Sequence, residues 1–124
     1  MDTVSLTIPG PPMGKARPRL TKYGVYTPKK TADYETLVKQ IYMSEVRQKL
    51  NGQLQVSMSA YFNIPQSIST KKRLLMLSGD IRPTKPPDCD NIMKIIMDSL
   101  NNIAYDDDRQ IVSAAIDKYY SDTP

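Results

Sequence analysis

The chain has 124 residues, a formal net charge of +4, one cysteine and no histidine. This length suits one domain spanning residues 1–124, and the lack of histidine argues against catalysis by a Ser-His or Cys-His pair. Because the thiol is alone and no apolar run of about 18 residues occurs, we expect no internal disulfide bond, no membrane-spanning helix and a cytoplasmic location.

The N-terminal half is predicted to contain a strand, a basic arm and a helix. Residues 3–10 alternate apolar and polar side chains, which is typical of a half-buried strand, and prolines end the run. Residues 13–30 are rich in Gly, Pro and basic side chains, so we expect a flexible arm with room for a short hairpin at Tyr23-Gly24. From 31 to 50 the apolar residues recur at helical spacing, with Thr31 as the expected cap.

Further strands and helices follow in the second half. Alternating apolar residues predict a strand over 54–64, and residues 69–78, closed by Gly79, are typical of a short helix. A proline-rich connector leads to an amphipathic helix over 91–103, and the Ile, Val and Tyr residues of 110–120 predict a last strand. This order indicates an α/β or α+β fold in which a small mixed sheet packs with two to three helices.

Charge is divided unevenly along the chain. Residues 1–87 carry fourteen Lys and Arg against five Asp and Glu, whereas residues 88–124 carry three against eight. No acidic residue lies between Thr3 and Ala32, where basic side chains are interleaved with tyrosines that can stack on exposed bases. The pattern favours nucleic-acid binding over ordinary solubilising charge, and the candidate contacts are Lys15, Arg17, Arg19, Lys22, Lys71, Lys72, Arg73, Arg82 and Lys85.

Two aspartates, Asp88 and Asp90, precede the predicted 91–103 helix. One of them is explained as a helix cap at the positive end of the helix dipole. The second carboxylate points to roughly the same side and repels the first unless a cation lies between them, and Mg²⁺ or Mn²⁺ accepts oxygen ligands of this kind. The residues alone support a metal site and a purely structural role about equally.

Lys94 and a run of three aspartates complete the candidate site. Lys94 falls one turn after Asp90, where it either reaches a phosphate or forms an ion pair with Asp90 or Asp98. The run at 106–108 forms either a solvated acidic turn or part of a metal pocket. Asp108 leads directly into the last predicted strand, but the spacing leaves open whether it lies near Asp88.

Residues 88–112 read DCDNIMKIIMDSLNNIAYDDDRQIV, with the pattern Asp-x-Asp-Asn-x-x-Lys-x-x-x-Asp-x-Leu followed by Asp-Asp-x-Gln. This block resembles the RusA family of Holliday junction resolvases, and PGPPMGKARPR at residues 9–19 is similar to the family's opening strand and basic turn. The resemblance implies a small RusA-like α/β homodimer that binds four-way, branched DNA and cuts it by hydrolysis with Mg²⁺, for which Mn²⁺ substitutes. It also implies a bacterial or phage-encoded protein of DNA recombination and repair, without a small organic cofactor.

Matching this motif residue by residue implies the roles of several side chains. Asp88, Asp90 and Asp108 match the family's metal-binding aspartates, and Lys94 matches its essential lysine, consistent with stabilising phosphate charge. Asp107 matches the first of the paired aspartates and is a weaker candidate ligand. The region that the family uses against DNA is occupied here by Lys15, Arg17 and Arg19.

The chain departs from the family pattern at its end and in the acidic run. Family members usually continue after 110–120 into one more strand, whereas this chain stops at Pro124, and the additional Asp106 makes the choice of ligand ambiguous by one position. Two other functions stay open: a non-catalytic protein that binds branched DNA, and a Mg²⁺-dependent nucleotide hydrolase. The long basic arm counts against the hydrolase, because a small substrate needs no such track.

Overall fold

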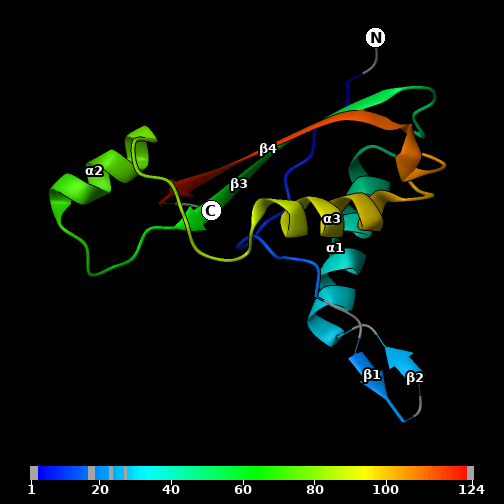
Figure 1. Ribbon diagram of the computed structural model, residues 1–124. Coiled ribbons are helices and arrows are strands. Elements are labelled where there is room, and N and C mark those ends of the chain that lie inside the picture. The colour runs from blue at the N-terminus through cyan, green and yellow to red at the C-terminus, as the bar shows by residue number, and fades with distance from the viewer. Residues whose placement is uncertain (1–2, 17–18, 23, 27, 123–124) are drawn as a thin grey trace.

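The computed structural model describes residues 3–16, 19–22, 24–26 and 28–122 (Figure 1). Within them it contains the helices α1 (Lys29–Glu45), α2 (Thr70–Ser78) and α3 (Cys89–Leu100), and the strands β1 (Arg19–Thr21), β2 (Gly24–Tyr26), β3 (Leu54–Asn63) and β4 (Ile111–Ser121). A single turn of 3₁₀ helix, η1 (Asp108–Gln110), precedes β4. The predicted mixed α/β class is confirmed.

β3 and β4 form a two-stranded parallel sheet. Their register pairs Tyr61 with Tyr119. Side chains alternate along β3, so Ala60 and Phe62 are buried whereas Tyr61 and Asn63 are exposed. One face of the sheet therefore packs inward and the other faces solvent. Both predicted strands are confirmed to within about one residue at each end.

α3 forms the middle layer, with the sheet on one side and α1 on the other (Figure 1). Ile92 of α3 packs against Ala60 and Phe62. A second cluster joins Tyr42 of α1 to Ala104 and Tyr105, which follow α3. Each fully buried apolar side chain in such clusters contributes about 1.5–3 kcal/mol. The two clusters fix both ends of α3, where the candidate acidic residues lie.

Three predictions for the N-terminal half are wrong: the strand at 3–10, the cap at Thr31 and the end of the helix at 50. No strand forms at 3–10, although burial alternates there and Val4 and Leu6 pack against the Tyr42 cluster. The apolar pattern thus predicted correctly which side chains point inward. However, no strand among the described residues pairs with the backbone of this segment. Thr31 is buried inside α1 instead of capping it, and the helix stops before 50 because Arg47 adopts a left-handed φ of 63°.

The shorter elements agree with prediction. Ser69 caps α2 by accepting a hydrogen bond from the Lys72 backbone N–H at 3.2 Å, and Gly79 ends the helix at a φ of 88° that glycine adopts without strain. β1 and β2 pair as a short antiparallel hairpin inside the basic arm. Among the described helices, none combines the length and the apolar character that a bilayer crossing requires.

Candidate functional site

The predicted acidic pair lies at the N-terminal end of α3. Asp88 is the residue before the helix, Asp90 is in its first turn, and both are exposed. Asp88 makes no capping hydrogen bond to the helix backbone; its Oδ1 accepts one from Asn91 Nδ2 at 2.5 Å. Two exposed carboxylates at the positive end of the helix dipole are therefore open to a cation.

Asp108 lies toward the opposite end of α3. Asp108 is the first residue of η1. Burial raises the pKa of the Tyr105 hydroxyl, and the negative charge of the Asp108 carboxylate, together with that of Asp98, raises it further. Since Asp98 follows Asp90 by about 12 Å of helix rise, Asp108 shares the far end of α3 with Asp98.

The structure does not bring Asp88, Asp90 and Asp108 together within one chain. No three acidic or cysteine side chains in the described ranges are grouped so that they could hold a metal ion. The acidic pair and Asp108 stand at opposite ends of the same helix.

The other two aspartates of the run have local structural contacts. Asp106 forms an ion pair with Lys49 at 2.6 Å. Asp107 caps η1 by accepting a hydrogen bond from the Arg109 backbone N–H at 2.9 Å, and it pairs with the Arg109 guanidinium at 3.0 Å. These hydrogen bonds from Arg109 lower the pKa of Asp107. Asp106 and Asp107 are thus each paired with a basic side chain of the same chain.

Lys94 forms an ion pair with Asp98, with 3.3 Å between Nζ and Oδ2. This is one of the two pairings considered from the sequence. Because the Lys94 side chain is 62% exposed, an i,i+4 pair of this kind contributes only a few tenths of a kcal/mol, roughly 0.2–0.5. The ammonium group thus stays accessible to a phosphate.

Lys15 ties the N-terminal segment to two helices. Its Nζ lies 3.1 Å from Glu35 Oε2 of α1 and 3.3 Å from Asp98 Oδ2 of α3, and its backbone N–H donates to the Asn91 carbonyl at 3.0 Å. Burial alone would lower the pKa of Lys15, but the hydrogen bonds and charges of Glu35 and Asp98 outweigh that effect and raise the pKa. Much of the charge of this predicted DNA contact is therefore balanced within the fold.

Replacing Lys15 by methionine should destabilise the protein by about 1.5–3 kcal/mol, because two partly buried carboxylates lose the cation between them. Thermal unfolding followed by circular dichroism measures this, with Lys29→Met, which removes an exposed ion pair, as the matched control. The difference should persist up to the ordinary lysine pKa of 10.5 and decline as the pH rises from there through the raised pKa of folded Lys15. Equal melting temperatures for the two variants would contradict the assignment.

Gly14 sets the close approach of the N-terminal segment to the start of α3. A Cβ atom at this position would lie 2.9 Å from Cβ of Pro87 and 3.3 Å from Cβ of Asn91. A residue without a side chain is thus needed to keep the segment this close. Gly14 was not among the predicted site residues, because its role depends on a contact with distant parts of the chain. The sequence feature that could have indicated this role is the position of Gly14 next to Lys15 in the proline-rich motif.

The second group of predicted basic contacts surrounds α2 and the ends of β3 and β4. Arg73 of α2 pairs with Asp122, and Arg82 pairs with Asp117 at 3.3 Å. Lys71 and Lys72 are exposed on α2. In the arm, Lys22 is exposed, Arg19 begins β1, and Arg17 lies outside the described residues.

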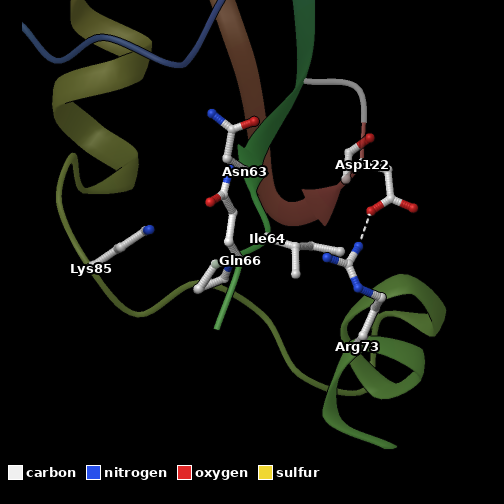
Figure 2. Close-up of a pocket in the computed structure, with 8 residues that line it drawn as sticks. Asn63, Ile64, Gln66, Arg73, Lys85 and Asp122 are labelled. Atoms are coloured by element: carbon white, nitrogen blue, oxygen red, sulfur yellow. Dashed lines mark hydrogen bonds and ion pairs between the residues drawn. The ribbon is translucent and has the colours of Figure 1, made fainter. Parts of the chain in front are cut away.

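A pocket of about 580 Å³ opens beside this basic group. Arg73 and Lys85 line it together with Asn63, Gln66 and Ser121. Figure 2 shows the Arg73–Asp122 pair on one side of the pocket and Lys85 on the other. Asp122 also lines the pocket and already pairs with Arg73, so Lys85 and the amide groups are the lining groups that remain suited to a phosphate.

Comparison with known proteins gives a family assignment that agrees with the residues at α3. The family model described as endodeoxyribonuclease RusA matches residues 9–124, which include the acidic pair, Lys94 and Asp108. The uncharacterized protein YqaN of Bacillus subtilis (strain 168) is 32% identical over 132 residues, an alignment that covers 100% of this chain and 92% of that protein. No solved structure matches the chain. The chain therefore belongs to the RusA endodeoxyribonuclease family.

Proposed function

We propose that this protein is a metal-dependent endonuclease that cuts four-way DNA junctions as a homodimer, and that it acts in DNA recombination and repair in the bacterial cytoplasm, encoded by the bacterium or by a phage. The observation that carries the proposal is the exposed pair Asp88 and Asp90 at the N-terminal end of α3, inside the family match. Basic side chains on the arm and around α2 supply the surface for a polyanion.

Asp88 and Asp90 are proposed as ligands of Mg²⁺, for which Mn²⁺ substitutes. The donor set fits, because carboxylate oxygens suit these ions and the sequence has no histidine to favour softer metals. A bound ion of this kind offsets charge on the phosphate and lowers the pKa of a water ligand. Asp108 is the proposed third ligand, and Asp107 is a weaker candidate because Arg109 already engages it.

Lys94 is proposed to contact the phosphate that is cut. Its ammonium group can leave the weak surface ion pair with Asp98 and bind the phosphate instead. There it would offset the negative charge that develops on the phosphate oxygens during cleavage. Lys15 is better suited to hold the arm in place, because Glu35 and Asp98 already balance its charge. The proposed DNA contacts are then Arg17, Arg19, Lys22, Lys71, Lys72, Arg73, Arg82 and Lys85.

A homodimer would remove the separation between the acidic pair and Asp108. If two α3 helices lie antiparallel across a two-fold axis, the start of each lies beside the end of the other. Asp88 and Asp90 of one copy would then approach the partner's Asp108. A four-way junction has the same two-fold symmetry and offers two equivalent strands to cut.

A second candidate function is the binding of branched DNA without cleavage. It is favoured by the lack of a three-carboxylate group within the described part of a single chain. In that case Asp88 and Asp90 have a structural role, through the helix dipole, which is worth about 0.3–1 kcal/mol for an exposed carboxylate, and through the hydrogen bond from Asn91 to Asp88.

A cleavage assay separates the two functions. With Mg²⁺ or Mn²⁺ we expect paired nicks near the branch point of a synthetic four-way junction, no cutting with EDTA, and no cutting of a linear duplex of the same sequence. Binding is measured separately by gel shift in Ca²⁺. A protein that binds the junction but cuts it with neither metal has the second function.

A further inference from the structure

A pair of tyrosines lies on the solvent face of the β3–β4 sheet. The rings of Tyr61 and Tyr119 stack with centroids 5.7 Å apart and planes inclined by 25°. The Arg82 guanidinium carbon lies 4.5 Å from the centre of the Tyr119 ring. We call Tyr61, Tyr119 and Arg82 the tyrosine surface. It has no role in the metal site proposed above.

Core packing does not account for the tyrosine surface. The inward face of the sheet is covered by α3, through the cluster of Ala60, Phe62 and Ile92. Tyr61 points the other way and keeps 46% of its surface exposed. Because Tyr61 and Tyr119 are partners in the β3–β4 register, backbone pairing holds both rings in place. A fixed aromatic pair that is exposed at Tyr61 and partly exposed at Tyr119 suits a flat aromatic ligand, since little conformational freedom is lost on binding.

Polar and cationic groups continue from the tyrosine surface along the same face. Both tyrosines and Arg82 line a hollow of about 350 Å³ together with Ser59 and Ser78. Two residues further along each strand, about 6.6 Å away, Asn63 and Ser121 line the 580 Å³ pocket that also holds Arg73 and Lys85 (Figure 2). Helix α2 borders both hollows, through Met76 and Leu77 in one and Arg73 in the other. Groups suited to a base and groups suited to a phosphate are thus neighbours.

We propose that the tyrosine surface stacks on unpaired bases of single-stranded DNA, and that the adjoining pocket with Arg73 and Lys85 holds their phosphates. The inference rests on the proposed function, because it adds a binding site for the same DNA substrate. Aromatic side chains stack on every base, so the site recognises that a base is unpaired and not which base it is. In a four-way junction such bases occur where pairing opens at the branch point.

A second copy of this chain fits the tyrosine surface less well than DNA does. Asp117 borders it through its ion pair with Arg82, and aspartate is depleted from protein–protein interfaces. The arginines on this face each carry one acidic partner, Asp117 for Arg82 and Asp122 for Arg73, and Asp80 lies beside Ser78 of the hollow. Three further positive charges are Lys71 and Lys72, which are exposed on α2, and Lys85, which lines the adjoining pocket. That balance is complementary to a phosphate backbone.

The test measures binding of a labelled oligo(dT) strand and of a duplex by fluorescence anisotropy in Ca²⁺. Tyr61→Leu and Tyr119→Leu should each weaken oligo(dT) binding by about tenfold, with the salt dependence and the duplex affinity unchanged. Tyr61→Phe and Tyr119→Phe keep the rings and should bind within about twofold of the wild type. Val112→Ala is the matched control and should have no effect, because Val112 is exposed on β4, as part of the same strand as Tyr119, but lies outside the tyrosine surface.

Several outcomes would overturn the inference. They are wild-type binding of oligo(dT) by both leucine variants, an equal loss of oligo(dT) and duplex binding, and an equal loss in the phenylalanine variants. Leucine variants that become monomeric in sedimentation with unchanged oligo(dT) affinity would assign the surface to a second copy. Because no cleavage is measured, the result is separate from the proposed function: a wild type that never cuts junctions but shows tyrosine-dependent oligo(dT) binding retains this inference.

Discussion

Asp90→Asn should reduce junction cleavage by roughly 10³-fold while junction binding stays within about twofold of the wild type. The amide keeps the size of the side chain but loses the negative charge that a metal ligand supplies. Asp90 is exposed in the first turn of α3, so the fold should lose only about 0.3–1 kcal/mol of helix-dipole stabilisation. Removing a negative charge also leaves attraction to a polyanion intact, so binding and cleavage should separate.

Single-turnover cleavage of a labelled junction in Mg²⁺, beside a gel shift in Ca²⁺, measures both quantities. Asp33→Asn is the matched control, because Asp33 is an exposed carboxylate near the start of α1 and should be replaceable without loss of cleavage. Cleavage at the wild-type rate by Asp90→Asn would remove the metal-ligand assignment. A parallel loss of binding and cleavage would show that Asp90 supports the fold and not the reaction.

Local sequence signals predicted the elements whose formation depends on local residues. Helix α2 was predicted over 69–78 with Gly79 as its end, and the structure places it at Thr70–Ser78 with Ser69 as its cap. The agreement is close because Gly79 acts through backbone contacts inside the segment. The apolar stripe of α3 likewise predicted a buried face, on which Ile92 and Ile95 lie. The alternation in β3 predicted which side chains point inward, since period-two burial follows from strand geometry.

Contacts between distant segments were beyond the reach of such signals. The alternation at 3–10 predicted a strand, yet a strand also needs a partner, and pattern alone does not show whether one is present. Lys15 was predicted to contact DNA from its basic surroundings, whereas folding brings Glu35 and Asp98 to its ammonium group. Asp88, Asp90 and Asp108 were candidate ligands because they are carboxylates, but their positions at opposite ends of α3 depend on how the turn after the helix folds.

That separation leads to the second large effect, which concerns two inactive variants. A heterodimer with Asp90→Asn in one copy and Asp108→Asn in the other should nick junctions, although each homodimeric variant is inactive. If each metal site takes Asp88 and Asp90 from one copy and Asp108 from the other, one site of the heterodimer collects both substitutions and the other collects neither. The intact site cuts one strand, so we expect nicking at about half the wild-type rate of first cuts and no resolution.

Co-expression of the two variants with different tags, followed by purification through both tags, yields the heterodimer for assay on a junction labelled on each strand in turn. The matched control pairs Asp88→Asn with Asp90→Asn. Both of its sites lack a ligand under the shared arrangement, so it should stay inactive. A site built within one chain predicts no activity for either heterodimer, since every copy then carries its own defect. If the Asp90→Asn and Asp108→Asn heterodimer fails to nick while a doubly tagged wild type cuts both strands, the shared site is excluded.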